Sequence, residues 1–414
     1  MISKLSSGAD QNFCEHFTHS FADLVSPVSV DQFFRDYWEK GFWHLRRESS
    51  NYYDLILKVG DLDHYLQGQN IPPHFIRVVK SQVEYEPRTW TNLEELRTAD
   101  TCRVVSVDKL FSIFEAGGTI ILNRAHKYIS SLTRFAVQLE RELKFLVTTN
   151  IYLTPPHSQG LFTHFDPHCV MILQISGRKK WRLYHFAEML PTNDVDYLTR
   201  QEVVGPPAYE CLLEPGDLLY VPRGLVHEAD TLDQTSIHIT LGLKTKSWFH
   251  LIEDLATLAM SDPVFRQALP TGLSSAREQE DFLQTFTQHF HELWEKTGAS
   301  ALLESRRRSF VEERLFDQQA RLSDLLQSER LNLNSIVVRR PGIDFIIERN
   351  HCETVIKFGT QKLIIERPFA PSLDRFLKDR PFAVREIEGL LTEKGKIELA
   401  SRFVCAGWLK ILSL

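Results

Sequence analysis

Three side chains that can bind a metal stand at alternate positions in the segment Thr163–Tyr184: His164, Asp166 and His168. In an extended chain, side chains two residues apart share a face and lie about 6.5–7 Å apart along the strand. One metal ion can therefore contact His164 and Asp166 together, whereas His168 would lie roughly 13 Å from His164. The pattern predicts two metal ligands here, and a third must come from elsewhere in the chain.

The best candidate for the third ligand is His227, in the segment Glu214–Ala229. Tight turns are predicted at residues 216–217 and 222–224, and together they would hold His227 at the rim of a small barrel. Two histidines and one carboxylate, with the other positions open, form the facial triad of non-haem Fe(II) oxygenases. A His-x-Asp pair alone is most often a solvated polar pair, but the second motif favours a metal site.

Strand alternation separates the cations that follow Gly177 into two sets. Lys179 shares a face with Trp181 and points inward, whereas Arg178, Lys180 and Arg182 form an outer face that we expect to be solvent-exposed. A lysine directed into a barrel is costly unless an anion meets it, and the distal carboxylate of a dicarboxylate cosubstrate would do so. The alternative is a lysine at a strand end that extends its amine to solvent.

Asn150 and Tyr152 alternate on one face of the strand that precedes these ligands, with Ile151 on the other face. Both could add hydrogen bonds inside the barrel, although each alone is more typical of a structural residue. His238, farther along the chain, is interpreted as a core residue or a support for the site.

The elements around these residues change character twice. Residues 1 to about 145 alternate helical and strand patterns, and residues from about 146 to 246 form short apolar strands between Gly and Pro turns, as in a sandwich or small barrel. Residues 247–330 have helical spacing of apolar residues, which favours a dimer interface over packing on the barrel. Residues 331–414 run strand, strand, helix, helix, an order that predicts a winged helix. Acidic and basic residues interleave along this segment, which favours a structural or substrate-docking role over DNA binding.

Composition excludes several other classes of protein. The 414 residues carry a net charge of −6, which argues against a dedicated nucleic-acid coat or a polybasic membrane binder. No apolar run reaches the roughly 20 residues of a membrane span, and the first residues have no apolar core typical of a secretory signal. No sequence signature for serine hydrolysis, a P-loop or a Rossmann fold is present. The six cysteines are scattered, which favours a reducing cytoplasm: Cys14, Cys102, Cys169, Cys211, Cys352 and Cys405.

Two motifs together resemble a known family. "HFDPH…LQISGRKKWRLY" followed by "EPGDLLYVPRGLVHEA" is similar to the JmjC-type 2-oxoglutarate oxygenases, and in particular to the ribosomal-oxygenase branch, whose members hydroxylate protein side chains. The resemblance implies an α+β protein with a double-stranded β-helix (a cupin jelly-roll barrel) in residues 1–246, whose barrel core spans about 146–246. It also implies a helical dimerisation domain at 247–330 and a C-terminal winged-helix domain at 331–414.

The resemblance also implies roles for individual residues. His164, Asp166 and His227 fall where the family binds Fe(II), and Lys179 falls where it grips the 5-carboxylate of 2-oxoglutarate. Asn150 and Tyr152 fall where members bind the cosubstrate or line the active site. This chain departs from the branch directly after the aspartate, where Pro167-His168 replaces acidic and apolar residues, so His168 is the expected marker of substrate.

The implied function is Fe(II)- and 2-oxoglutarate-dependent hydroxylation of a protein or peptide side chain, with succinate and CO2 as coproducts, by a homodimer. Three alternatives remain. The same core could hydroxylate a small metabolite or natural product. A nucleic-acid modifier would need a basic groove that this acidic chain does not indicate. The last alternative is a non-catalytic scaffold or regulator, in which an intact triad and an inward lysine would have little use.

Overall fold

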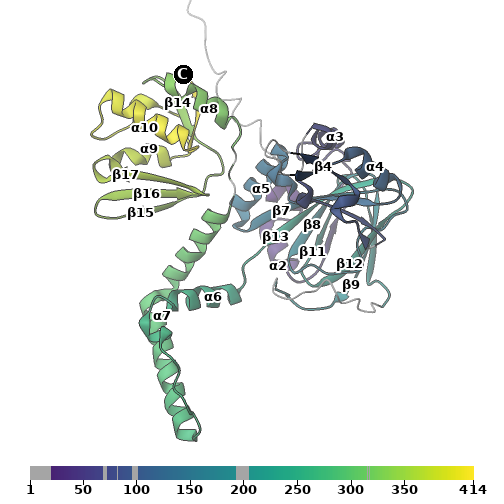
Figure 1. Cartoon of the computed structure of the whole chain (residues 1–414), viewed down its shortest axis with the longest axis horizontal. Helices are drawn as coiled ribbons and strands as arrows, with labels where there is room; N and C mark the ends of the chain where they lie inside the picture. The colour runs from purple at the N-terminus through teal and green to yellow at the C-terminus, as the bar shows by residue number, and fades with distance from the viewer. Residues whose placement is uncertain are drawn as a thin grey trace, which may run out of the picture. The chain divides into compact units, whose positions relative to one another are not determined.

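The computed structural model describes residues 20–68, 72–81, 83–95, 101–192, 205–314, 316 and 318–414, so that Cys14 and the N-terminal segment lie outside the described residues. The chain divides into two compact units, Met1–Lys244 and Thr245–Leu414 (Figure 1). In the described part of the chain, no helix is long and apolar enough to cross a membrane.

An eight-stranded antiparallel sheet forms the centre of the first unit, in the order β1-β11-β8-β13-β7-β6-β2-β3. The strands at its centre come from the region in which the barrel is predicted, whereas β1, β2, β3 and β6 come from the chain before residue 146. The bounds are β1 Trp43–Leu45, β2 Ile76–Lys80, β3 Val83–Glu84, β6 Thr119–Leu122, β7 Leu146–Thr154, β8 Cys169–Ser176, β11 Leu218–Val221 and β13 Ser236–Lys244.

A second antiparallel sheet, β10-β9-β12, faces the first, as expected for a jelly-roll barrel. Between them, Val170 and Ile172 of the large sheet pack with Trp181 and Leu183 of the small one. This cluster is the barrel interior, and the remaining hairpin β4-β5 forms a separate pair. The strands span β4 Thr91–Glu95, β5 Thr101–Val105, β9 Lys179–Phe186, β10 Tyr209–Leu213 and β12 Leu225–Thr231.

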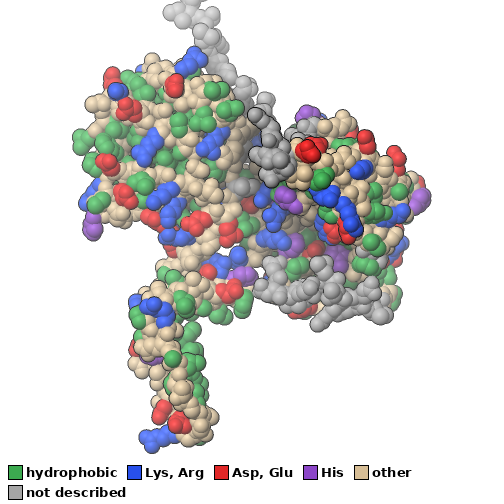
Figure 2. Space-filling view, in the orientation of Figure 1, with side chains coloured by type: hydrophobic (Ala, Val, Ile, Leu, Met, Phe, Trp, Pro, Cys, Tyr) green, Lys and Arg blue, Asp and Glu red, His purple; other side chains and the backbone are tan. Residues whose placement is uncertain are grey.

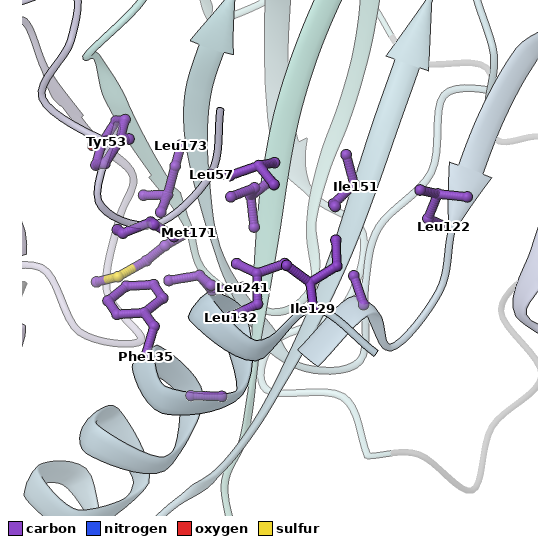
Figure 3. Packing of buried hydrophobic residues seen from close by; sticks show 14 of the residues in the cluster. Tyr53, Leu57, Leu122, Ile129, Leu132, Phe135, Ile151, Met171, Leu173 and Leu241 are labelled. Atoms are coloured by element: carbon purple, nitrogen blue, oxygen red, sulfur yellow. The ribbon is translucent and has the colours of Figure 1, made fainter. Parts of the chain in front are cut away.

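Helices cover the outer face of the large sheet. Met171 and Leu173 of β8 point away from the barrel interior and pack with Leu132 and Phe135 of α5 (Figure 3). Strand alternation therefore divides β7, β8 and β13 between a helix-covered core and the barrel interior. The helices of this unit are α1 Phe21–Val25, α2 Val30–Asp36, α3 Val59–Gly68, α4 Val107–Glu115 and α5 Ser130–Leu143.

The second unit begins with helices α6 Trp248–Ala259, α7 Ala276–Glu313 and α8 Arg321–Gln327. Ser275 and Glu278 form a capping box that starts α7, and Gly298 kinks this helix with φ 66°. The helical spacing predicted over residues 247–330 is interrupted in the structure, because α7 ends where Arg314 turns to an extended conformation and α8 begins only at Arg321.

The rest of this unit contains two three-stranded antiparallel sheets, β18-β14-β19 and β15-β16-β17. Phe376, Phe403 and Trp408 lie in their common core with α9 and α10. The bounds are β14 Ile336–Arg339, β15 Ile346–Arg349, β16 Glu353–Phe358, β17 Gln361–Glu366, α9 Leu373–Leu377, β18 Phe382–Ala383, α10 Glu393–Cys405 and β19 Leu409–Ser413.

Candidate active site

His164, Asp166 and His227 come together at one end of the barrel. Each offers a ligand atom, and the three atoms lie within 4.8 Å of one another. The backbones of His164 and His227 exchange two hydrogen bonds, at 3.0 and 2.8 Å, and the Gly224 amide donates to the Asp166 carbonyl at 2.9 Å. The 222–224 turn and strand β12 therefore hold all three side chains in place.

Hydrogen bonds orient both imidazole rings. Nδ1 of His164 donates to the Phe162 carbonyl at 2.6 Å, and Nδ1 of His227 donates to the Leu225 carbonyl at 3.0 Å. With the proton on Nδ1, each Nε2 keeps a free lone pair. Nε2 of His227 lies 3.7 Å from Oδ2 of Asp166. Two such nitrogens beside a carboxylate are a donor set that fits Fe(II).

The protonation states of this set also suit a metal. Burial lowers the pKa of His227 to about 4. Burial alone would raise the pKa of Asp166, but His168, His164 and His227 outweigh it and hold that pKa below its ordinary value. At neutral pH the two groups are therefore a neutral imidazole and a carboxylate, the forms that bind metal.

His168 lies outside this group of three. The expectation that it does not join the ligands agrees with the geometry, but the assumed reason was wrong, because residues 165–168 form a loop and not an extended strand. Its Nδ1 instead lies 2.9 Å from Nζ of Lys244.

Lys179 points into the cavity that contains the three candidate ligands. Its side chain is 4% exposed, and Nζ donates to Oγ1 of Thr154 at 3.0 Å. Burial lowers the pKa of Lys179 to about 7, an effect that Asp230 partly offsets. A buried amine of this kind favours an anionic ligand, since the ligand's charge would stabilise the ammonium form.

Tyr152 lines the same cavity, and burial raises its pKa to about 12. Asn150 is not among the residues that line it. The Asn150 side chain accepts a hydrogen bond from the Arg124 amide at 3.0 Å and interacts with Tyr152, so its contact with the cavity is indirect.

His238, predicted as a core residue or a support for the site, and Trp181, predicted to point inward, both line this cavity. Nδ1 of His238 and Nε1 of Trp181 are buried without a hydrogen-bond partner among the described residues. The His238 ring stacks on Tyr152 at 4.7 Å between centroids, and the Trp181 ring lies 5.6 Å from His238. Strand alternation in the sequence is sufficient to predict that His238 lies inside the barrel. That its Nδ1 lacks a partner cannot be predicted in this way, because it depends on how the strands pack.

The outer face of β9 differs from the sequence prediction. Lys180 pairs with Glu210 at 2.5 Å, and Arg182 pairs with Asp230 of β12. The predicted solvent-exposed cations are half-buried in cross-strand ion pairs, because β10 and β12 flank β9 and supply acids opposite them.

Comparison with known proteins identifies related sequences. Residues 122–251 match the JmjC domain. The bifunctional lysine-specific demethylase and histidyl-hydroxylase NO66 of Aedes aegypti is 33% identical over 263 residues, which cover 61% of this chain and 40% of that protein. Ribosomal oxygenase 1 of Rattus norvegicus is 30% identical over 261 residues, which cover 60% of this chain and 42% of that protein. The chain thus spans about two fifths of the length of these curated relatives.

Solved structures resemble a larger part of the chain. The Escherichia coli ribosomal oxygenase YcfD matches with a TM-score of 0.53 and 16% identity, over 93% of this chain and 98% of that one. The same protein in complex with cobalt and 2-oxoglutarate matches with a TM-score of 0.52 and 15% identity, over 94% and 99% of the two chains. At this identity the likeness concerns the fold alone.

Proposed function

Since residues 122–251 of this chain are a JmjC domain, we propose that the protein is an Fe(II)- and 2-oxoglutarate-dependent oxygenase that hydroxylates a protein or peptide side chain. The observation that carries this proposal is the shared cavity of His164, Asp166, His227 and Lys179. Three metal donors and a buried amine in one cavity have little use in a scaffold, because a buried amine that hydrogen-bonds only to a neutral hydroxyl destabilises the fold.

The three ligands would hold Fe(II) through Nε2 of His164, Nε2 of His227 and the Asp166 carboxylate. When bound, the metal supplies open coordination positions and the redox chemistry of oxygen activation. Cobalt and 2-oxoglutarate together in the complex of YcfD, which shares this fold, support a metal and a cosubstrate here.

Lys179 and Thr154 would bind the distal carboxylate of 2-oxoglutarate. Their mutual hydrogen bond already directs Nζ into the cavity. The unpaired Nε1–H of Trp181 is a further donor in the same space. The apolar side chains Val170 and Ile172, which also line the cavity, limit the access of water to the cosubstrate.

A protein substrate is favoured over a small metabolite for two reasons. His164 and Asp166 are half-buried rather than enclosed, so the candidate metal site is open to a side chain from outside. The relatives are named histidyl-hydroxylase and ribosomal oxygenase, which are activities on macromolecules.

The proposal is tested with Asp166→Ala, compared with Asp233→Ala. Removal of a ligand should lower Fe(II) affinity and succinate formation by roughly 100-fold or more, since loss of even an outer partner costs 10–100-fold. Asp233 pairs with Arg178 at 3.4 Å and does not line the cavity, so Asp233→Ala should retain both Fe(II) affinity and succinate formation. Peptide mass spectrometry of host proteins should show additions of one oxygen atom that depend on the wild-type chain. Unchanged succinate formation in Asp166→Ala would refute the site, and a modified metabolite without any modified peptide would refute the substrate class.

We also infer that the helices in 247–330 form a homodimer interface. Leu283, Phe286, Phe290 and Trp294 lie on one side of α7 and are 42–59% exposed. Figure 2 shows hydrophobic side chains along the surface of this helix. A continuous apolar stripe of this kind is unusual on a monomer, and a second copy is the commonest partner of a soluble chain.

A winged-helix domain in 331–414 would serve structure or substrate docking. Its support is the arrangement of α10 with short antiparallel sheets around one core. Cations there pair with acids, as in Arg375–Glu386 at 2.7 Å and Lys394–Glu398 at 3.5 Å, a pattern that does not favour binding to a phosphate backbone.

A further inference from the structure

Lys244, at the end of β13, is a second lysine on the inner face of the large sheet. In β13, His238 and Thr240 line the cavity of the candidate active site, and strand alternation places Gly242 and Lys244 on the same face. Lys179 reaches Thr154, which pairs with Ser236 at the other end of β13. A strand rises about 3.3 Å per residue, so Ser236 and Lys244 at the two ends of β13 lie roughly 26 Å apart. Lys179 and Lys244 therefore lie at opposite ends of the barrel interior.

His168 holds the amine of Lys244. The register of β8 and β13 pairs Cys169 with Leu243, which sets His168 opposite Lys244 across the strand ends. Nζ of Lys244 lies 2.9 Å from Nδ1 of His168. Because the ammonium can only donate, the imidazole nitrogen accepts this hydrogen bond.

Gly242 makes room for this histidine. A Cβ at Gly242 would lie 2.9 Å from Nε2 of His168 and 2.6 Å from Oγ1 of Thr148. Glycine within a strand is unfavourable and often marks a close approach of another group. His168, Gly242 and Lys244 therefore pack together, and the hydrogen bond to His168 holds the Lys244 amine in place.

Arg124 adds a second cation. This residue is exposed, adopts a left-handed conformation with φ 50°, and its amide donates to Asn150 on the neighbouring strand β7. Arg124 and Asp166 are the charged groups that influence Lys244. A metal on Asp166 would engage the negative charge of that carboxylate, and Asp166 would then offset less of the charge of Lys244, which lies on the strand face that lines the cavity.

We propose that Lys244 and Arg124, with His168 as the positioning residue for Lys244, bind a carboxylate of the peptide substrate beside the residue that is hydroxylated. The inference rests on the proposed function and adds a substrate class to it, namely peptides with aspartate or glutamate at one set position from the reacting residue. It also gives His168, which distinguishes this chain from the family pattern, a role in substrate choice although it is not one of the three candidate ligands.

The test measures peptide binding and does not depend on turnover. The full chain is loaded with Mn(II) and an unreactive analogue of 2-oxoglutarate, and a library of short synthetic peptides is scanned with Glu, Gln or Lys at each position. We expect a preference for Glu over Gln at one position. Lys244→Met should weaken binding of the Glu peptide by about 5-fold, the equivalent of one surface charge pair at its upper range, and leave the Gln peptide unchanged. His168→Leu should have a smaller effect in the same direction, and Lys244→Arg should restore the preference.

Controls separate this role from an effect on the metal. Lys58→Met, at an exposed lysine of the same unit, should change nothing. Mn(II) affinity should stay within about twofold in Lys244→Met, because the affected partner is the peptide. If Lys244→Met weakened the binding of the Glu and Gln peptides equally and also weakened Mn(II) binding, the proposal would be overturned. Lys244 would then act on the metal ligand Asp166 and not on the peptide. Peptide binding with no acidic preference, or a preference for phosphorylated peptides or RNA, would overturn it as well. If no peptide binds and none is hydroxylated, the proposed function itself fails.

Discussion

Among single residues, Lys179 shows most directly how function and stability oppose each other. Its amine is buried beside Thr154, with a pKa near 7 in place of 10.5. The folded protein therefore bears a cost for this side chain at any pH where the unfolded chain would keep the amine protonated. An anionic cosubstrate would offset that cost, because its carboxylate stabilises the ammonium form.

Replacement of Lys179 by Met should stabilise the protein while abolishing binding of 2-oxoglutarate. The cost is complete below about pH 7, where folded and unfolded chains are both protonated, and it declines as pH rises towards 10.5, because only the unfolded chain still holds the proton. The gain in free energy of unfolding should be on the order of a few kcal/mol at pH 6 and close to zero above pH 10. Thermal unfolding across this pH range measures it.

Titration calorimetry supplies the second measurement for Lys179. At pH 8, binding of 2-oxoglutarate to the wild type should take up a proton, seen as a dependence of the binding heat on the buffer, and Lys179→Met should show no binding. A variant that is less stable than the wild type at pH 6, or that binds 2-oxoglutarate equally well, would contradict the assigned role.

Among the elements, the turn at 222–224 positions the metal ligands. Its Gly224 amide donates to the Asp166 carbonyl, and the strand that follows brings His227 to His164. Arg223 is buried and pairs with Glu39 at 2.7 Å, which ties the turn to the N-terminal part of the unit. A short turn thus connects two ligands that are far apart in the sequence.

Gly224→Ala should damage both the fold and the metal site. Gly224 has φ 83°, and a Cβ would lie 1.9 Å from the carbonyl oxygen of Glu188. We expect a loss of about 2 kcal/mol or more in stability, as for other side chains forced into a left-handed position against backbone. Chemical denaturation and Fe(II) titration measure the two effects.

Gly205→Ala is the matched control, because a Cβ at that position meets nothing within 4 Å. Normal Fe(II) affinity in a destabilised but folded Gly224→Ala protein would show that the turn does not position Asp166.

For the whole molecule, the apolar stripe on α7 makes a prediction about assembly. Replacement of Phe286 and Phe290 together by Glu should convert a dimer to a monomer, because four charges would face each other across the interface without partners. Light scattering after size-exclusion chromatography measures the mass. Gln288→Glu, on the opposite side of the helix, is the control and should remain dimeric. A wild type that is monomeric at all concentrations would refute the interface.

The sequence alone determined much of the candidate site, and the reason is the regular alternation of a strand. Alternation placed Lys179 and Trp181 inside the barrel and Ile151 outside it, as the structure does. The types and spacing of His164, Asp166 and His227 were sufficient to predict a facial triad, because each ligand pair depends on local geometry or on a recognisable turn. The strand patterns predicted a sandwich or small barrel, and the resemblance to the JmjC-type oxygenases implied that it is a jelly-roll barrel.

Only the tertiary structure decided what depends on contacts between distant segments. The loop at 165–168 is not extended, since backbone bonds to β12 and to the 222–224 turn hold it, and no local pattern contains those bonds. Strand pairing leaves Nδ1 of His238 without a hydrogen-bond partner among the described residues. It also packs His168 against Gly242 and brings it to Lys244. Sequence patterns describe which face a residue occupies, whereas the partner it meets there is set by the register between strands, which is a property of the folded chain.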